Sequence, residues 1–466
     1  MATEIKFGTD GFRGIIADDF TYENVKKITV AISKYILNHA LGKTVLIGYD
    51  PRFTADKFAE FSSDILKDFG FKVLLSNQVV PTPVLAYAAT VEKDCAGAVM
   101  FTASHNPKEY LGIKYIPSYG GPATKEMTDE IVSLIDNCDC KTFENQIGEQ
   151  GGEVVLKDFS EEYFCRIEKL IDFDVIKKAA PKFIYDGLYS SSIGYFDTLL
   201  KRNGIEFETF NMHHDPNFGG GLPEPKAKFM KHTKTGYLTF ANDGDADRYG
   251  VMDEEGEYVS PNVIMAILLK YLYNRGHKGK MIKTAGVSEI IDITAGKLGI
   301  ETITTPGGFK WLSEKMREND TILAGEDSGG LSIGSHIPEK DGIFANLLIL
   351  EAVCSTKKPL SELKKEAVKF AGQEFFQDRV DIRLKLNEEK EAVMKKFSKM
   401  PEIAGFKVYD TLKIDGVKFF LKNQSGMNAG WILMRKSGTE PLLRFYIETS
   451  DIKNMELIKG FIAKNI

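Results

Sequence analysis

The sequence has few cysteines, and none of them is paired at the spacing of a metal site. The five cysteines occur at positions 95, 138, 140, 165 and 354, and no CxxC pair occurs among them. This pattern argues against a zinc site, whose thiolate ligands are usually spaced in that way. The isolated Cys138-Asp-Cys140 is compatible with a reducing compartment, where free thiols persist.

The chain also lacks a basic excess and any long apolar run. Its 66 acidic residues outnumber its 60 basic residues and give a net charge of −6, whereas nucleic-acid and membrane surfaces need positive charge. No apolar stretch approaches a membrane span, and residues 1–7 lack the features of a signal peptide. We therefore expect a cytoplasmic protein that binds neither nucleic acid nor membrane.

What the sequence does contain is an ordinary globular composition over 466 residues, with 43% hydrophobic and 27% charged residues. A chain of this length is too long for one core and divides into several domains. Strand-like and helix-like segments alternate along most of it, which is typical of α/β units with largely parallel sheets. We predict four domains around a central cleft, over residues 1–150, 151–254, 255–372 and 373–466.

Three of these domains follow one plan. Each has a first strand, a helix, a second strand, and a later strand that ends in a polar loop. The first strands cover residues 44–50, 182–187 and 280–284, and the loops cover 102–107, 242–248 and 325–330. Three loops rich in polar and charged residues, each at the end of the later strand of its unit, favour a true triplication. The smaller last domain differs, because residues 407–420 and 430–434 look like antiparallel strands with turns at 415–416 and 428–430.

The second polar loop predicts a metal site. Asp243, Asp245 and Asp247 alternate, so in an extended segment their carboxylates point to one side. Three oxygen ligands suit Mg²⁺ better than zinc. A calcium-binding helix-loop-helix also starts DxDxD, but Arg248 occupies the sixth place, which requires glycine, and the flanking residues are strand-like.

The first polar loop presents a serine. Ser104 follows a buried strand over residues 95–101, and Pro107 forces a turn. No GxSxG elbow supports acyl transfer, and His105 is expected to face away from Ser104 because strand neighbours alternate. A hydroxyl near a carboxylate-held cation instead favours phosphoryl transfer, since the cation neutralises phosphoryl oxygens.

Three further segments predict anion and hydroxyl binding. Residues 435–444 place Gly438 and two hydroxyls between Arg435 and Arg444, a combination suited to a phosphate. Arg13 lies in the glycine-rich segment 7–14, which lacks the spacing of a nucleotide-binding P-loop. The third polar loop, Gly325-Glu-Asp-Ser-Gly-Gly330, can exchange hydrogen bonds with a diol.

Together these motifs identify the chain as similar to the α-D-phosphohexomutase superfamily. The resemblance rests on FGTDGFRG (7–14), TASHNP (102–107), DGDADR (243–248), GEDSGG (325–330) and RKSGTEPLLR (435–444), in this order. It implies three related α/β domains plus a smaller α+β C-terminal domain with a TATA-binding-protein-like fold. It also implies an intramolecular phosphotransferase whose matching serine, Ser104, carries a phosphoryl group.

The resemblance also implies roles for individual residues. One Mg²⁺ per chain would be held by Ser104, in its phosphorylated form, and by the three aspartates. Arg13, Lys114 and His105 would form the catalytic surroundings of Ser104. The substrate-binding residues would be Arg248, Gly308, Lys310, Glu326, Ser328, His336, Arg435, Ser437, Gly438, Thr439 and Arg444.

The implied reaction interconverts a hexose 1-phosphate and a hexose 6-phosphate through a hexose 1,6-bisphosphate, which acts as intermediate and activator. In mannose and glucosamine enzymes of the superfamily the sugar loop often ends Ser-Gly-His, whereas here it ends Ser328-Gly329-Gly330. This favours glucose phosphate, with His336 or Lys310 supplying the missing contact. Mannose or glucosamine phosphate is the alternative, and a non-catalytic sugar-phosphate binder is a third. We expect a monomer or a homodimer.

Overall fold

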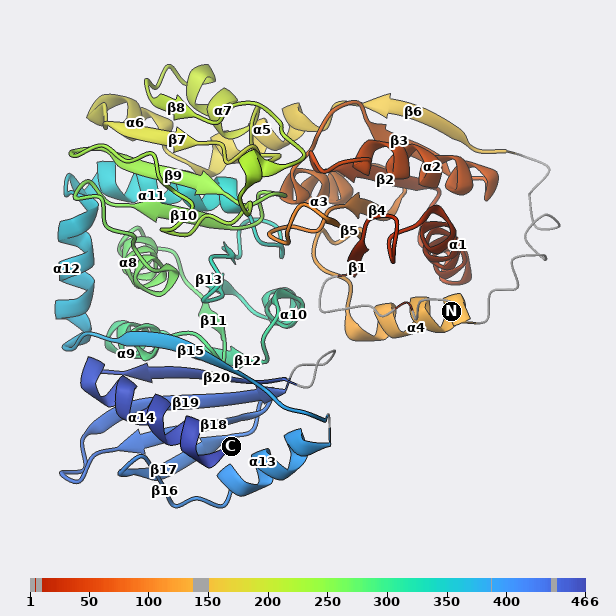
Figure 1. Ribbon diagram of the computed structural model, residues 1–466. Coiled ribbons are helices and arrows are strands. Elements are labelled where there is room, and N and C mark those ends of the chain that lie inside the picture. Colours follow the sequence, from red (N-terminus) through yellow and green to blue (C-terminus); the bar gives the residue numbers. More distant parts are fainter. Residues whose placement is uncertain (1–4, 6–10, 137–150, 387, 437–441) are drawn as a thin grey trace.

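The computed structural model describes residues 5, 11–136, 151–386, 388–436 and 442–466. Four β-sheets organise the chain, each with its own helices (Figure 1). We name the four parts unit I (residues 12–157), unit II (160–252), unit III (261–371) and unit IV (376–465). In the described residues, none of the helices combines the length and the apolar character that crossing a membrane requires.

Units I to III share one four-stranded core. In each, three strands run parallel in the order second, first, third, and a fourth strand pairs antiparallel with the third. These cores are β3-β2-β4-β5 in unit I, β8-β7-β9-β10 in unit II and β12-β11-β13-β14 in unit III. The predicted triplication is confirmed, and each polar loop joins the third strand to the fourth.

Unit I extends this core at both edges. β1 pairs with β5, and β6 pairs with β3, so the first sheet extends past the boundary that we predicted at residue 150. Its third strand is buried along its whole length, as expected for a strand covered on both faces. The elements are β1 (Phe12–Ile15), α1 (Tyr22–Asn38), β2 (Thr44–Tyr49), α2 (Ala55–Asp68), β3 (Lys72–Ser76), α3 (Thr82–Val91), β4 (Cys95–Phe101), β5 (Tyr110–Ile116), α4 (Lys125–Asp136) and β6 (Glu153–Lys157).

Units II and III form one continuous apolar core together with residues of α3 and of one face of the first sheet. Helix α11 follows the third sheet in sequence but packs against the strands of the second (Figure 1), and Asn346 Nδ2 donates to the Ala241 carbonyl at 3.1 Å. Asp341 caps this helix by accepting the N–H of Phe344 at 2.8 Å. The elements of unit II are α5 (Ser160–Leu170), α6 (Phe173–Ala179), β7 (Phe183–Asp186), α7 (Phe196–Arg202), β8 (Glu208–Phe210), β9 (Leu238–Asn242) and β10 (Tyr249–Met252).

Unit III begins at a well-defined helix start. Ser260 accepts the N–H of Val263, and Pro261 occupies the first turn, where no N–H partner is needed. The elements are α8 (Pro261–Asn274), β11 (Lys280–Thr284), α9 (Glu289–Leu298), β12 (Thr302–Thr305), α10 (Phe309–Glu318), β13 (Thr321–Gly325), β14 (Leu331–Ser332), α11 (Gly342–Thr356) and α12 (Leu360–Ala371).

Unit IV is an antiparallel sheet in the order β15-β20-β19-β18-β17-β16. Helices α13 and α14 cover one face, where Phe397, Phe445 and Ile458 are fully buried. The turn predicted at residues 428–430 is wrong, because Asn428 already begins β19 and the turn precedes it. The elements are β15 (Phe376–Arg383), α13 (Glu389–Phe397), β16 (Glu402–Ile403), β17 (Phe406–Leu412), β18 (Val417–Lys422), β19 (Asn428–Lys436), β20 (Leu442–Thr449) and α14 (Ile452–Asn465).

The other face of the fourth sheet packs on unit III through buried polar groups. Lys418 donates to the Ala285 carbonyl at 2.8 Å, and its ammonium lies 3.7 Å from the centre of the Trp431 ring. The Trp431 indole N–H donates to Glu448 at 2.7 Å, and Glu448 also accepts the N–H of Glu289 at 2.9 Å. These contacts hold unit IV against the end of the third sheet.

Candidate active site

The loop between β4 and β5 holds Ser104 in a strained backbone conformation. Its φ is 51°, in the left-handed region that non-glycine residues seldom adopt. The Ser104 N–H donates to Thr102 Oγ1 at 2.8 Å, and the buried Ser104 hydroxyl donates to Asp243 Oδ2 at 2.8 Å. The loop of unit I therefore presents its hydroxyl directly to the aspartate loop of unit II.

The same turn changes the place of His105. We expected this ring to face away from Ser104, but His105 Nδ1 lies 3.3 Å from Ser104 Oγ. The left-handed residue interrupts the alternation of an extended strand, so that neighbouring side chains share one side. Burial, together with the charges of Arg248 and Arg13, lowers the pKa of His105 to about 2, which keeps the imidazole neutral at physiological pH.

Two arginines, Arg13 and Arg52, donate hydrogen bonds to the loop between β4 and β5. Arg13 Nη1 donates to Asn106 Oδ1 at 2.6 Å and to the Ala103 carbonyl at 3.2 Å. Arg52 is fully enclosed and pairs with Asp50, 3.2 Å away. The Arg52 guanidinium also donates to four carbonyls of the loop and its end, those of Ser104, Asn106, Pro107 and Tyr110.

Arg52 was missed from the sequence. Its only local signal is Asp50-Pro-Arg52 directly after a buried strand, because the carbonyls that it binds lie more than fifty residues away. Burial raises the pKa of Asp50 to about 6, although Arg52 and Thr102 oppose this change. The pair therefore shapes the loop, while its own charges stay out of contact with water.

The aspartate loop between β9 and β10 brings three carboxylates together. Asp243, Asp245 and Asp247 are buried and offer ligand atoms within 4.8 Å of one another. Burial, then the charges of Asp247 and Asp245, raise the pKa of Asp243 well above its usual value. An acidic cluster this close needs compensating positive charge in order to remain ionised.

Two lysines from other units supply positive charge at the trio. Lys114 of β5 lies 2.9 Å from Asp245 Oδ2 and 3.7 Å from Asp247 Oδ2. Lys340, just before α11, lies 3.1 Å from Asp247 Oδ2. Burial alone would raise the pKa of Asp245, but Lys114 and the hydroxyl of Thr82, which donates at 2.7 Å, bring it below its usual value.

The residues present fit a magnesium ion. The donor set is all oxygen, as Mg²⁺ prefers, and the buried atoms Asp245 Oδ1 and Asp247 Oδ1 have no hydrogen-bond partner within the described residues. Ser104 Oγ is already within 2.8 Å of one member of the trio. Arg248 closes the loop by donating its backbone N–H to Asp243 Oδ1 at 2.9 Å.

The third loop, between β13 and β14, joins the neighbouring turn at residues 305–308. Glu326 Oε1 accepts the N–H of Gly308 at 3.1 Å. The Ser328 hydroxyl is buried without a partner among the described residues. Burial raises the pKa of Glu326, while Lys340 and Arg248 oppose this change. Lys310 extends over the Trp311 ring, 5.4 Å from its centre.

The place of the missing histidine is filled by a lysine. A Cβ added at Gly330 would lie 2.4 Å from Lys340 Cδ, so the aliphatic part of Lys340 occupies the space that a side chain there would need. Lys340 was missed from the sequence, where it stands in Pro338-Glu-Lys-Asp341, outside the motifs we used. It connects the loop between β13 and β14 of unit III to the aspartate loop of unit II.

Unit IV contributes paired guanidinium groups. Arg435 and Arg444 lie directly opposite each other on β19 and β20. The buried Nε atoms of both have no partner within the described residues. Asp415 Oδ2 bridges Arg435, at 2.6 Å, to the N–H of Gly307, at 2.9 Å. The predicted phosphate-binding residues Ser437, Gly438 and Thr439 lie outside the described residues.

His336, which we predicted to bind substrate, lies at the start of α11. Its ring is fully buried, and Nε2 lies 2.9 Å from Asp341 Oδ2. The ring also packs 5.2 Å from Phe344 and 6.3 Å from Tyr87. His336 therefore joins the start of α11 to unit I, and its contact with a substrate stays a prediction.

With this geometry established, the chain can be compared with known proteins. Four models described as phosphoglucomutase/phosphomannomutase domains match it in order. The alpha/beta/alpha domain I model matches residues 4–141, domain II matches 161–256, domain III matches 260–370, and the C-terminal domain matches 382–465.

Individual relatives agree along the whole chain. A phosphoglucomutase/phosphomannomutase of Thermococcus kodakarensis is 29% identical, covering 99% of this chain and 97% of the relative. A phosphoglucosamine mutase of Methanocaldococcus jannaschii is also 29% identical, with coverages of 99% and 97%. A crystal structure described as a phosphomannomutase from Thermus thermophilus is 30% identical, with a TM-score of 0.85, and covers 100% of this chain and 99% of that one.

Proposed function

The chain belongs to the phosphoglucomutase/phosphomannomutase family and is an enzyme of the phosphohexomutase superfamily, and from this we propose that it interconverts glucose 1-phosphate and glucose 6-phosphate. The observation that carries the mechanism is the contact between Ser104 Oγ and Asp243, 2.8 Å long, inside a buried carboxylate trio. A hydroxyl in this setting is suited to carry a phosphoryl group.

The two group transfers balance as follows. The 6-hydroxyl oxygen of glucose 1-phosphate attacks the phosphorus on Ser104, so that the new P–O6 bond forms as the P–Oγ bond breaks. The proton that the sugar hydroxyl loses is the proton that Ser104 Oγ needs. After the bisphosphate has reoriented, Ser104 Oγ attacks the phosphorus on O1, the P–O1 bond breaks, and O1 takes the proton. The product is glucose 6-phosphate, and Ser104 is phosphorylated again.

The surrounding residues have distinct tasks in this proposal. A bound Mg²⁺ would be held by Ser104 and the three aspartates, and would supply charge that neutralises the transferring phosphoryl group. Lys114 and Arg13 add positive charge near Ser104, and the neutral imidazole of His105, 3.3 Å from Oγ, is placed to share a hydrogen bond with it.

Unit III would bind the sugar, and unit IV would bind the substrate phosphate that is not reacting. Glu326 and Ser328 offer an acceptor and a hydroxyl to two neighbouring sugar hydroxyls. Arg435 and Arg444, opposite each other on adjacent strands, suit the phosphate that is not reacting, because planar guanidinium groups match its oxygens. One such phosphate site has to accept the 1-phosphate and the 6-phosphate in turn. Arg248, Gly308 and Lys310 complete the proposed substrate-binding group.

The preference for glucose over glucosamine rests on Gly330 and Lys340. The Lys340 side chain fills the space beside Gly330 and raises the local positive charge next to Glu326. The ammonium group of a glucosamine phosphate would meet this charge unfavourably, whereas a hydroxyl would not. This repulsion disfavours glucosamine and leaves glucose and mannose as neutral sugars.

The second candidate is a phosphoglucosamine or phosphomannose mutase. It is favoured by the relatives at 29% and 30% identity that bear those names. The sugar is decided by measuring kcat/KM for glucose, mannose and glucosamine 1-phosphates on the same magnesium-loaded enzyme. We expect glucose to exceed glucosamine by about tenfold or more. A preference for glucosamine would overturn the proposed sugar but not the phosphoserine mechanism.

The metal is tested separately. Chelation with EDTA is expected to stop turnover of every sugar phosphate, and Mg²⁺ is expected to restore it. An Asp247→Asn variant should need a higher Mg²⁺ concentration for half-maximal activity, because one anionic ligand is lost. Full activity in EDTA would contradict the role assigned to the aspartate loop.

A further inference from the structure

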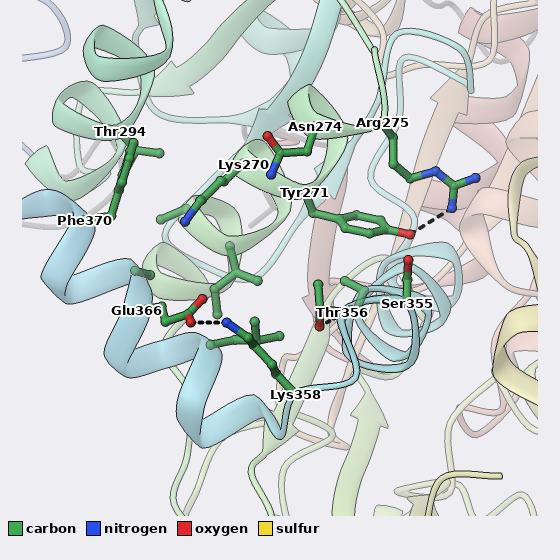
Figure 2. A pocket seen from close by; sticks show the side chains of 15 residues that line it. Lys270, Tyr271, Asn274, Arg275, Thr294, Ser355, Thr356, Lys358, Glu366 and Phe370 are labelled. Atoms are coloured by element: carbon green, nitrogen blue, oxygen red, sulfur yellow. Dashed lines mark hydrogen bonds and ion pairs between the residues drawn. The ribbon is translucent and has the colours of Figure 1, made fainter. Parts of the chain in front are cut away.

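A separate cavity of about 510 Å³ lies among the helices of unit III and shares no residue with the candidate active site (Figure 2). It is bounded by α8, α11 and α12, with one residue from α9. Its volume falls in the range typical of small-molecule sites. The cavity is therefore large enough to hold a ligand of its own.

The cavity exists because the three helices around it present small alanine side chains to one another. Ala266 of α8, Ala352 of α11 and Ala367 of α12 all line the cavity, and all three are buried. A longer side chain at any of these places would extend into the space between the helices. Ile267 and Leu363 complete an apolar lining, which suits the apolar body of a ligand.

A buried hydroxyl in this cavity is without a partner. Thr294 of α9 is 2% exposed and lines the cavity. Its Oγ1 atom makes no hydrogen bond within the described residues. Buried hydroxyls are almost always hydrogen-bonded, because an unpartnered one is costly. Thr294 is thus available to a polar atom of a ligand.

The charge of the lining favours an anion. Three cations and one anion line the cavity, namely Lys270, Arg275, Lys358 and Glu366. Arg275 pairs with buried Glu351, and Lys358 pairs with Glu366, as Figure 2 also shows for the second pair. In the described part of the chain, Lys270 has no carboxylate within ion-pair distance.

Lys270 instead lies against an aromatic ring. Its ammonium is 4.8 Å from the centre of the Phe370 ring, and Figure 2 shows it extending from α8 on the side of α12. The ammonium of Lys297 lies 5.6 Å from the same ring. The apolar body of a ligand would therefore pack on the alanines and Leu363 while its anionic group meets Lys270. The charge of Lys270 acts on Glu366 from beyond ion-pair distance, so the ammonium can still contact one negative charge on the ligand.

We propose that this cavity is a second ligand site, which binds a small organic monoanion with an aromatic or similarly apolar body. The site lies outside the catalytic loops, and the proposal does not depend on which sugar the enzyme converts. Recognition combines the apolar lining, the ammonium of Lys270 and the hydroxyl of Thr294.

The probe for this site is 8-anilinonaphthalene-1-sulfonate, an aromatic monoanion whose fluorescence rises in apolar surroundings. We expect saturable binding to the folded, full-length protein and a Kd about tenfold higher in Lys270→Gln, because a charge-assisted contact is lost. The matched control is Lys369→Gln, which removes an exposed lysine of α12 that does not line the cavity. This control should leave the Kd unchanged.

Two further measurements make the result decisive. Ala367→Trp is expected to fill the cavity and abolish dye binding; if this variant does not fold, Thr294→Val, expected to raise the Kd, takes its place. Inorganic phosphate at millimolar concentration, which competes at the catalytic phosphate site, should not displace the dye. The proposal would be overturned if the wild type, Lys270→Gln and the cavity variant (Ala367→Trp, or Thr294→Val in its place) bound the dye with equal Kd values. Displacement of the dye by phosphate would also overturn it.

Discussion

The hydroxyl of Ser104 reaches Asp243 because its own backbone takes a left-handed turn, with φ at 51°. Such a conformation is unfavourable for a residue with a Cβ and persists only where the surroundings enforce it. Here Arg52 enforces it by binding the carbonyl of Ser104 itself and that of Asn106 just after it. The strain and the support come from different segments of unit I.

Replacing Ser104 by alanine should remove the phosphoryl carrier. We expect the intact mass of purified wild-type protein to include one phosphoryl group that Ser104→Ala lacks. Mutase activity should fall by about 10³-fold or more, since removing a nucleophile has effects of this size. Ser133→Ala, an exposed serine of α4, is the control and should keep both mass shift and activity. Near-normal turnover in Ser104→Ala would refute the phosphoserine mechanism.

His105 makes stability depend on pH in a definite direction. Its pKa is lowered to about 2, so the neutral ring stabilises the fold fully above the unfolded value of about 6.5. This stability is lost as the pH falls below 6.5, because the unfolded chain then binds a proton that the folded chain does not.

Substituting this ring should weaken the dependence on pH. In His105→Gln, the loss in the free energy of unfolding between pH 7 and pH 4.5 should be about 2 kcal/mol smaller than in the wild type. Urea unfolding at both pH values measures it, and the exposed His277→Gln is the control. An unchanged difference between the two pH values would mean that the ring is protonated in the folded protein.

At the scale of single residues, the sequence predicted the groups that are close together along the chain. The aspartate trio was predicted from alternation within five residues, and the structure brings the three carboxylates together. Arg52, Thr82 and Lys340 were not predicted, because each acts on a loop far away in sequence. The burial of the His336 ring against Asp341 was not predicted either, because Asp341 belongs to the start of a helix whose packing no local pattern reveals.

At the scale of the elements, the serine loop of unit I and the aspartate loop of unit II are in close backbone contact. A Cβ on Gly244 would lie 2.5 Å from the Ser104 carbonyl oxygen, and the Ser191 N–H donates to the Gly244 carbonyl at 3.0 Å. Only a residue without a side chain allows the aspartate loop to approach the serine loop this closely.

Gly244→Ala should therefore separate the two loops. We expect a loss of about 1–3 kcal/mol in the free energy of unfolding, as for other overpacked sites, together with a fall in kcat of more than about tenfold, because the Ser104–Asp243 geometry is disturbed. The control is Gly296→Ala in α9, where an added Cβ meets no atom within 4 Å. That change should be neutral or stabilise by up to about 1 kcal/mol. Equal stability and kcat in both variants would contradict the close approach.

The order of the helices and strands was largely predictable. The edge strand of the first sheet and the start of β19 were not. Alternating apolar segments revealed the three α/β units, because strands buried on both faces read as continuous apolar runs. The pairing of β6 with β3 was not predicted, since the apolar run of β6 is only three residues long and those residues are exposed. In unit IV, Asn428 and Gly430 read as turn residues, but pairing with β18 makes them part of a strand.

Over the whole molecule, the four units meet through polar contacts as well as apolar ones. Ser104 of unit I contacts Asp243 of unit II, Lys340 of unit III contacts Asp247, and Asp415 of unit IV contacts Gly307. The candidate site is therefore complete only when all four units are in place. This arrangement follows from the shared strand order, which puts the three loops at equivalent positions of their sheets.

The contact between units III and IV contains a buried lysine. Burial and the charge of Lys283 lower the pKa of Lys418 to about 7, with Glu448 opposing. Because this pKa lies below the unfolded value, the stability contribution is full only above about pH 10.5 and is lost as the pH falls toward 7. Lys418 therefore stabilises the folded protein less near neutral pH than at about pH 10.

The contact between units III and IV can also be followed by tryptophan fluorescence. The chain has two tryptophans; Trp431 is fully buried where units III and IV meet, and Trp311 is partly buried on α10. In a Trp311→Phe variant the remaining indole should emit at short wavelength and resist acrylamide quenching. Emission typical of a water-exposed indole in the folded variant would contradict the docking described above. Any rotation of unit IV during turnover then becomes visible as a change in the colour and quenching of a single native fluorophore, without an attached label.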